Sequence, residues 1–143
     1  MKYVLVYWSR FGHNKKIVEK LSTKLQEKGA KTQILQTNEA DPKKMPEADT
    51  YIFSASAEAF RVQKNMRNFM KKLEDMSGKK YGIINTHAMK SKNWLKSMEK
   101  LLTKKDMEKI AEIDFIIGKQ GQQEGTGFVG DWENKINEFS KKI

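Results

Sequence analysis

Short apolar runs alternate along the chain with longer segments in which apolar residues recur every three or four positions. The first run, residues 2–8, is almost continuously apolar, which is typical of a strand that is covered on both faces of a parallel sheet. The next segment, residues 14–28, places its apolar residues on one face and predicts an amphipathic helix that ends at Gly29. This alternation favours the α/β class of folds.

The same pattern continues to the end of the chain and predicts four more strands and three more helices. The further strands are expected at residues 31–36, 50–54, 80–86 and 112–118, and residues 31–36 are polar enough for a sheet edge. The further helices are expected at residues 60–76, 93–104 and 131–143, the last capped by Asp131. Residues 54–59, 86–92 and 118–130 are expected to be loops, residues 106–111 a short turn, and residues 42–45 at most a short helix.

Five strands alternating with helices predict a three-layer, doubly wound parallel sheet with helices on both faces. The edge-like second strand favours the order 2-1-3-4-5 for the strands in chain order. We see no repeat, linker or low-complexity tract, so we expect residues 1–143 to form a single domain.

Composition narrows the functional classes. Hydrophobic residues make up 38% and charged residues 32% of the chain, and no apolar run approaches the ~20 residues of a membrane helix. The absence of cysteine excludes disulfides, a thiol nucleophile and thiolate metal ligands. Residues 1–3 lead directly into the first strand without a cleavage site, so we predict no signal peptide. The lack of cysteine fits a cytoplasmic location, which we expect.

Charge is distributed unevenly. The formal net charge is +10, and residues 61–109 carry 14 Lys and Arg against 5 Asp and Glu. Such a surface attracts acidic proteins, nucleic acids or acidic lipid head groups, although a solvated lysine-rich helix face explains it equally well. Nucleic acid is disfavoured because no aromatic residues are interleaved for base stacking. Since the helices at 60–76 and 93–104 lie on one face in the predicted order, we expect a one-sided basic surface.

The turn at residues 9–15 is the strongest candidate for a binding site. In the predicted order it lies at the switch point between strands 1 and 3, together with the loops at 54–59 and 86–92. It brings backbone N–H groups and the positive end of a helix to the sheet edge, where they suit an anion such as phosphate. Ser9 and Asn14 add polar side chains, and Gly12 permits close approach. Taken alone, the turn fits an ordinary capped strand-to-helix connection equally well.

Over nearly its full length the chain resembles the short-chain flavodoxins. Their first loop reads roughly Ser/Thr-x-Thr-Gly-Asn-Thr, and residues 9–14, Ser-Arg-Phe-Gly-His-Asn, match common forms of it at the first, second and fourth positions. Residues 54–60, followed by a helix with Met66, Phe69 and Met70, are similar to the loop beside the flavin ring. Residues 86–89 match the third flavin loop in position.

The resemblance implies an FMN-binding electron carrier or a small flavin oxidoreductase, with non-covalent FMN and redox partner proteins, acidic ones among them. The residues implied around the phosphate are Ser9, Arg10, Phe11, Gly12, His13 and Asn14. Those implied around the isoalloxazine are Ser54, Ala55, Ser56, Ala57, Glu58, Thr86, His87, Ala88 and Met89. Phe60 and Trp94 are the nearest aromatic residues for covering the ring. The substitutions at positions 11, 13, 14 and 55–58 leave one alternative, a flavodoxin-fold binding module that has lost FMN and acts through its basic surface.

Rival motifs are weaker. Residues 125–130 match G-x-G-x-x-G, but no second strand follows them, so a nicotinamide site is disfavoured. No P-loop sequence and no Gly-x-Ser-x-Gly elbow is present. A receiver domain is excluded because strands 1 and 3 end without carboxylates, although Lys119 follows strand 5. His13 and His87 lack the neighbours of a zinc site. We therefore predict no metal site and no catalytic side chain.

Overall fold

The computed structural model describes residues 1–58, 60–89, 92–118 and 127–143. Within them, the main sheet has the order β2-β1-β3-β5-β6, and its strands pair in parallel. These strands are β1 (Lys2–Tyr7), β2 (Lys31–Gln36), β3 (Thr50–Glu58), β5 (Lys80–His87) and β6 (Glu108–Ile116). Counted along the chain, this is the predicted order 2-1-3-4-5, and the doubly wound α/β fold is confirmed.

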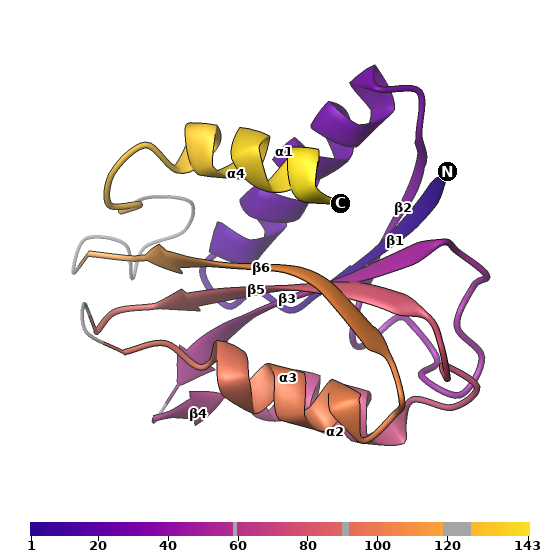
Figure 1. Cartoon of the computed structure of the whole chain (residues 1–143). Helices are drawn as coiled ribbons and strands as arrows, with labels where there is room; N and C mark the ends of the chain where they lie inside the picture. Colours follow the sequence, from indigo (N-terminus) through magenta and orange to yellow (C-terminus); the bar gives the residue numbers. More distant parts are fainter. Residues whose placement is uncertain (59, 90–91, 119–126) are drawn as a thin grey trace.

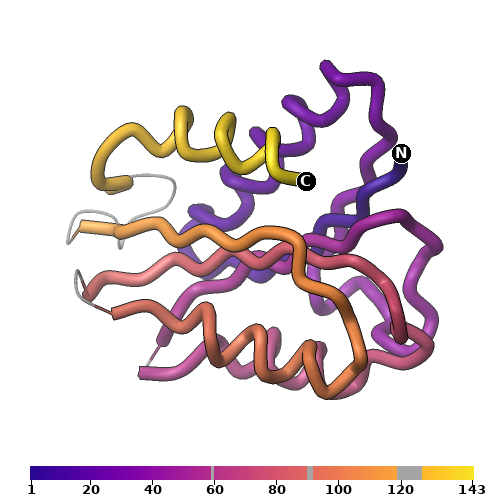
Figure 2. Tube along the Cα trace, in the orientation of Figure 1, coloured from indigo at the N-terminus to yellow at the C-terminus, as the bar shows by residue number. Residues whose placement is uncertain are grey.

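Helices cover both faces of the sheet (Figure 1). On one face lie α1 (His13–Glu27) and α4 (Trp132–Lys142), and on the other lie α2 (Lys64–Lys72) and α3 (Leu95–Thr103). The Cα trace shows α2 and α3 side by side beneath the sheet (Figure 2), in agreement with the contacts between them. The predicted placement of the two lysine-rich helices on one face is therefore confirmed.

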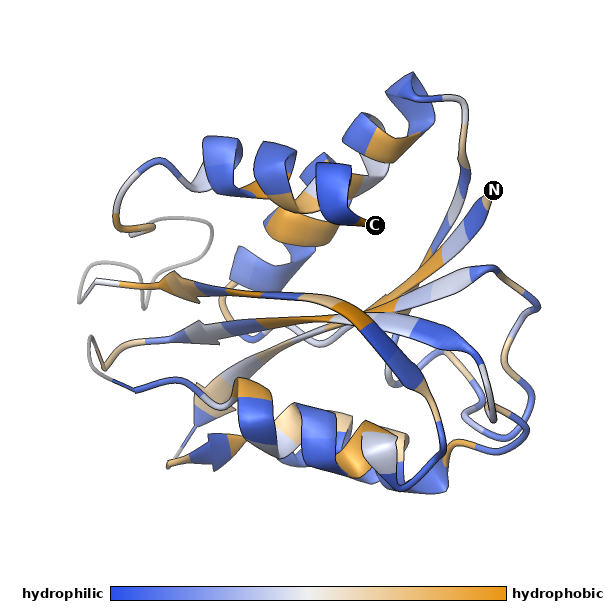
Figure 3. Cartoon of the chain, viewed as in Figure 1, coloured by the Kyte–Doolittle hydropathy of each residue, from blue (hydrophilic) through white to orange (hydrophobic). Residues whose placement is uncertain are grey.

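Two hydrophobic cores lie on opposite faces of the sheet. Along β1, Val4 and Val6 belong to the core under α2 and α3, whereas Tyr3, Leu5 and Tyr7 belong to the core under α1 and α4. All five are buried, because successive residues of a strand point to opposite faces and both faces are covered. Hydrophobic segments of the ribbon accordingly face the sheet and hydrophilic ones face outward (Figure 3). This packing makes the strand ends a firm support for loops.

The predicted loop at 54–59 and the predicted helix start at residue 60 are wrong. Strand β3 continues to Glu58 because it stays paired with β5 as far as Ser56 and Thr86. The chain then turns back as a short hairpin with β4 (Arg61–Val62), in which Glu58 pairs with Arg61. Phe60 has a φ of 61° at the turn. Helix α2 begins only after this hairpin and ends at residue 72, not 76.

Of two shorter predictions, the turn over residues 106–111 is wrong, whereas residues 42–45, expected to hold at most a short helix, stay within that limit. Residues 106–111 do not form a turn throughout, because β6 begins at Glu108, opposite Lys80 of β5. Residues 42–45 form no helix; the amide of Lys44 donates to the carbonyl of Asp41 at 3.0 Å, which makes a single turn. Residue 59, residues 90–91, Lys119 and the start of the 125–130 motif lie outside the described residues. Within the described ranges, no helix combines the length and apolar character needed to cross a membrane.

Candidate functional site

A cavity of about 390 Å³ lies at the carboxyl end of the sheet, at the switch point between β1 and β3. Three segments form most of its wall: the β1–α1 loop, the end of β3 and the end of β5. The lining residues are Arg10, Phe11, His13, Ser56, Ala57, Glu58, Thr86, His87, Ala88, Ile117 and Gly118.

The β1–α1 loop leads into a helix whose cap residue is a glycine. Gly12 has a φ of 88°, in the left-handed region that favours glycine, and directly precedes α1. As a glycine, Gly12 supplies no side-chain cap to this helix, whose first turn contains no acidic residue. Earlier in the same loop, the Ser9 hydroxyl is buried and has no hydrogen-bond partner among the described residues. Amides at a helix start and a buried hydroxyl without a partner are groups that an anion satisfies.

Asn14 ties the three segments together from beneath. Its side chain is fully buried, and its amide nitrogen donates to Ser56 Oγ at 2.7 Å and to Thr86 Oγ1 at 3.2 Å. Its amide oxygen accepts from Ser54 Oγ at 2.7 Å. The Ser56 and Thr86 hydroxyls are also 2.7 Å apart. The Asn14 side chain, which the resemblance implies beside the phosphate, therefore makes its hydrogen bonds to β3 and β5.

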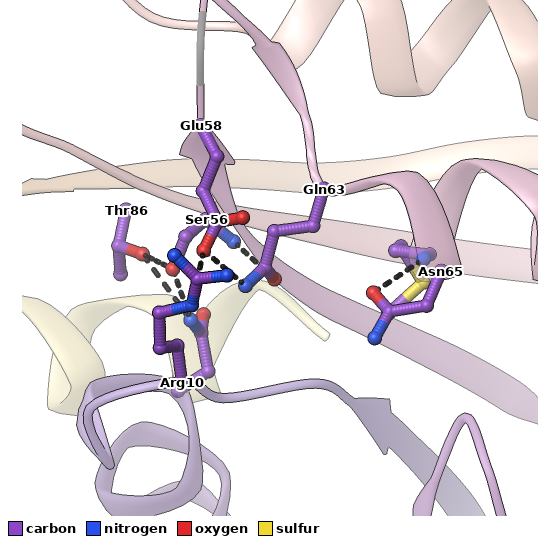
Figure 4. Close-up of polar contacts among 8 residues, drawn as sticks. Arg10, Ser56, Glu58, Gln63, Asn65 and Thr86 are labelled. Atoms are coloured by element: carbon purple, nitrogen blue, oxygen red, sulfur yellow. Dashed lines mark hydrogen bonds and ion pairs between the residues drawn. The ribbon is translucent and has the colours of Figure 1, made fainter.

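A second polar chain links the first loop to the β3–β4 hairpin (Figure 4). Arg10 Nε lies 3.5 Å from Glu58 Oε1, and Gln63 Nε2 donates to the same oxygen at 3.1 Å. Gln63 is buried, and its Oε1 accepts from the backbone amide of Ser56 at 3.1 Å. These contacts hold the hairpin against the first loop. They also give the Arg10 guanidinium a carboxylate partner, Glu58.

The third segment is fixed by a His–Asp pair. His87 is buried; its Nδ1 is 2.7 Å from the carbonyl oxygen of Met89, and its Nε2 is 2.5 Å from Asp114 Oδ2 on β6. A carbonyl can only accept, so Nδ1 donates to Met89, while Nε2 faces the Asp114 carboxyl group. The pair joins β5, β6 and the loop after β5 at the cavity wall.

His13 belongs both to the cavity and to an aromatic cluster. Its ring meets that of Phe128 edge to face, with centroids 5.3 Å apart, and Phe128 stacks on Trp132 at 4.5 Å. His13 is only 4% exposed. The cluster connects the start of α1 to the start of α4 and orients the His13 ring at the cavity edge.

The structure brings nine of the predicted site residues into the cavity wall, namely Arg10, Phe11, His13, Ser56, Ala57, Glu58, Thr86, His87 and Ala88. The other six do not line it: Ser9, Gly12, Asn14, Ser54, Ala55 and Met89. Phe60 and Trp94 are not among its lining residues and instead line a separate groove between α2 and α3. Phe11, 38% exposed, is the aromatic residue of the first loop that does line the cavity.

Sequence reasoning missed four residues at or behind this wall: Gln63, Asp114, Ile117 and Gly118. Asp114 stands between the apolar residues Ile113 and Phe115 of β6, which is the one sign of a special role that the sequence offers. Gln63 falls within a segment whose apolar spacing predicts a helix, so nothing in the pattern sets it apart.

The strand order and the cavity at its switch point define a flavodoxin-like α/β protein. The family model described as "Flavodoxin domain" matches residues 4–124. The chain therefore belongs to the flavodoxin domain family.

Solved flavodoxin structures are similar to this chain in fold. A flavodoxin from the domain Archaea superposes with a TM-score of 0.75 at 14% identity, covering 98% of this chain and 94% of that one. The Streptococcus pneumonia TIGR4 flavodoxin gives 0.73 at 16% identity, covering 99% and 97%. Oxidised flavodoxin 1 from Bacillus cereus gives 0.75 at 10% identity, covering 99% and 96%. A search of curated protein sequences gives no match.

Proposed function

We propose that this protein binds FMN non-covalently, with the flavin ring in the cavity and the phosphate beside it at the loop of residues 9–14, and that it exchanges electrons with partner proteins. One observation carries the proposal: among the described residues the buried Ser9 hydroxyl has no hydrogen-bond partner, and it lies in the loop that leads through Gly12 into the start of α1. This donor set fits a phosphate group, because helix N-termini and hydroxyls bind anions without a compensating cation. When bound, FMN supplies the redox chemistry, and the protein supplies binding and orientation.

Each segment has a distinct part in the proposed site. The loop at residues 9–14 holds the phosphate through its backbone amides and Ser9. The ends of β3 and β5, residues 54–58 and 86–89, flank the flavin ring. Asn14 and the His87–Asp114 pair hold these segments at a fixed separation through the hydrogen bonds described above. Phe11 and His13 line the cavity and contribute rings that exclude water from part of its wall.

Titration of the purified protein with FMN, followed by quenching of flavin fluorescence, tests the proposal. We expect saturable quenching for the wild type and about tenfold weaker binding for Ser9→Ala, since a hydrogen bond to a charged group contributes about 1.5 kcal/mol. Thr50→Val is the matched control, because Thr50 also has a buried hydroxyl without a partner in the described part of the chain but lies at the opposite end of β3.

We expect Thr50→Val to bind FMN like the wild type, and both variants to be at least as stable as the wild type, because each loses an unsatisfied hydroxyl. If the wild type does not quench FMN fluorescence, FMN binding is contradicted. The remaining hypothesis is then the flavodoxin-fold binding module that has lost FMN. Equal weakening by both variants would contradict the role given to Ser9.

A further inference from the structure

A groove of about 510 Å³ runs between α2 and α3, on the face away from α1 and α4. We call it the basic groove because six of its lining residues are cationic and none is acidic. The six are Arg61, Arg67, Lys71, Lys92, Lys100 and Lys104. Part of the excess positive charge of residues 61–109 therefore lines a single groove.

The cations of the basic groove have no carboxylate partners within the described chain. None of the six forms an ion pair there, whereas lysines on other surfaces do, as Lys20 does with Glu133 and Lys109 with Glu99. Like charges gathered without counter-charges repel one another and destabilise the compact state. An anionic ligand neutralises these charges and so removes the repulsion. A surface that serves only solubility has no need for its charges to line one groove.

The spacing of these cations fits an extended acidic peptide. Arg67 and Lys71 lie four residues apart on α2, which is about 6 Å along the helix axis, and Lys100 and Lys104 have the same spacing at α3. In an extended chain, every second side chain points to the same face, at intervals of about 6.6 Å. Glu or Asp at alternate positions therefore places successive carboxylates beside successive cations.

The aromatic residues of the basic groove favour a protein over a single-stranded nucleic acid. Trp94 is buried, and its Nε1 donates to the Phe60 carbonyl at 2.8 Å, so its ring offers no open stacking surface. Phe60 is 73% exposed at the end of the groove and offers an apolar contact. One exposed ring suits the mixed apolar and charged character of a protein interface.

The basic groove and the cavity share the β3–β4 hairpin. Glu58 lines the cavity, while Phe60, Arg61 and Val62 of the same hairpin line the groove. We propose that the basic groove is the docking site for an acidic segment of a partner protein, with Asp or Glu at alternate positions, and that docking places this partner beside the cavity. This inference does not depend on FMN being bound.

Fluorescence anisotropy with a labelled peptide of alternating Glu and Ser tests the proposal. The purified full chain is titrated with and without added FMN, so a failure of cofactor binding is seen separately. The groove variant is Lys71→Gln/Lys100→Gln/Lys104→Gln. The matched control is Lys64→Gln/Lys72→Gln/Lys96→Gln, which removes the same charge from exposed residues of the same helices outside the groove. Thermal unfolding checks that both variants are folded.

We expect the wild type to bind this peptide and not its Gln-Ser counterpart. The groove variant should bind at least tenfold more weakly, and the control variant within about twofold of the wild type, since screened charges outside the groove contribute little. Equal losses in the two variants would overturn the proposal, because they would show attraction by net charge alone. Absence of peptide binding, or tighter binding of single-stranded DNA of the same charge, would also overturn it.

Discussion

The Asn14 network gives the most direct test of how the site is built. The perturbation is Asn14→Ala, which removes three side-chain hydrogen bonds at a fully buried position. At about 1 kcal/mol each, these bonds contribute about 3 kcal/mol to the free energy of unfolding. Alanine regains up to about 0.7 kcal/mol because it is the better helix former in the first turn of α1. We therefore expect a net loss of about 2–3 kcal/mol.

Urea unfolding followed by tryptophan fluorescence measures this loss, as a lower midpoint with an unchanged slope. Asn134→Ala is the matched control, because it makes the same substitution on an exposed part of a helix. We expect that variant to lie within about 0.5 kcal/mol of the wild type.

A double-mutant cycle with Ser54→Ala sharpens the test. In Asn14→Ala, the buried Ser54 hydroxyl loses its acceptor, so removing that hydroxyl as well should cost little more. The two losses should therefore fall short of additivity by about 1 kcal/mol. Additive losses, or a loss below about 0.5 kcal/mol for Asn14→Ala, would refute the network. Weaker FMN binding without any loss of stability would instead indicate a direct contact between the Asn14 side chain and the phosphate.

Three further predictions concern the stability of the fold. Gly82→Ala should cost about 1–2 kcal/mol in urea unfolding, because a Cβ there would lie 2.9 Å from Ile52 Cδ1 and 3.2 Å from Phe139 Cζ. Asp131→Ala should cost about 1 kcal/mol by the same assay, because the carboxylate caps α4 by accepting from the Asn134 amide. In both cases an unchanged midpoint would contradict the prediction. In the folded protein the pKa values of four tyrosines are raised above 10.0, mainly by burial. The folded state therefore holds their phenolic protons more tightly than the unfolded chain does. The free energy of unfolding should therefore be highest below pH ~10 and should fall as the pH rises through these raised pKa values, as measured by urea midpoints. The four are Tyr3, Tyr7, Tyr51 and Tyr81.

The order of strands and helices was predictable because it depends on local apolar periodicity. Residues 31–36 form a strand with the predicted bounds, and the predicted helix at 14–28 is shifted by one residue at each end. The β3–β4 hairpin was not predictable in this way. Residues 55–59 are mostly alanine and are followed by a helix-like spacing at Val62 and Met66, so the pattern does not mark Phe60 as a turn. Pairing with β5, a tertiary contact, decides the outcome there.

The positions of the site segments were predictable from topology, since parallel strands bring their carboxyl ends to one edge. Their side-chain partners were not. Asn14 meets Ser54 and Thr86 across 40 and 72 residues of chain, and His87 meets Asp114 across 27. No local rule relates residues so far apart, and the individual types fit solvent-exposed loops equally well.

The departures from the family's first-loop pattern have a physical explanation in the proposed site. If the phosphate is held by backbone amides, the start of α1 and Ser9, then the side chains at positions 11, 13 and 14 need not contact it. Each of the three has another task in this structure: Phe11 lines the cavity, His13 packs on Phe128, and Asn14 joins β3 to β5. Substitution at positions 11, 13 and 14 therefore weakens anion binding less than the mismatch with the family's first-loop pattern suggests. The features that cannot be exchanged are those that shape the backbone, above all the left-handed Gly12 before α1.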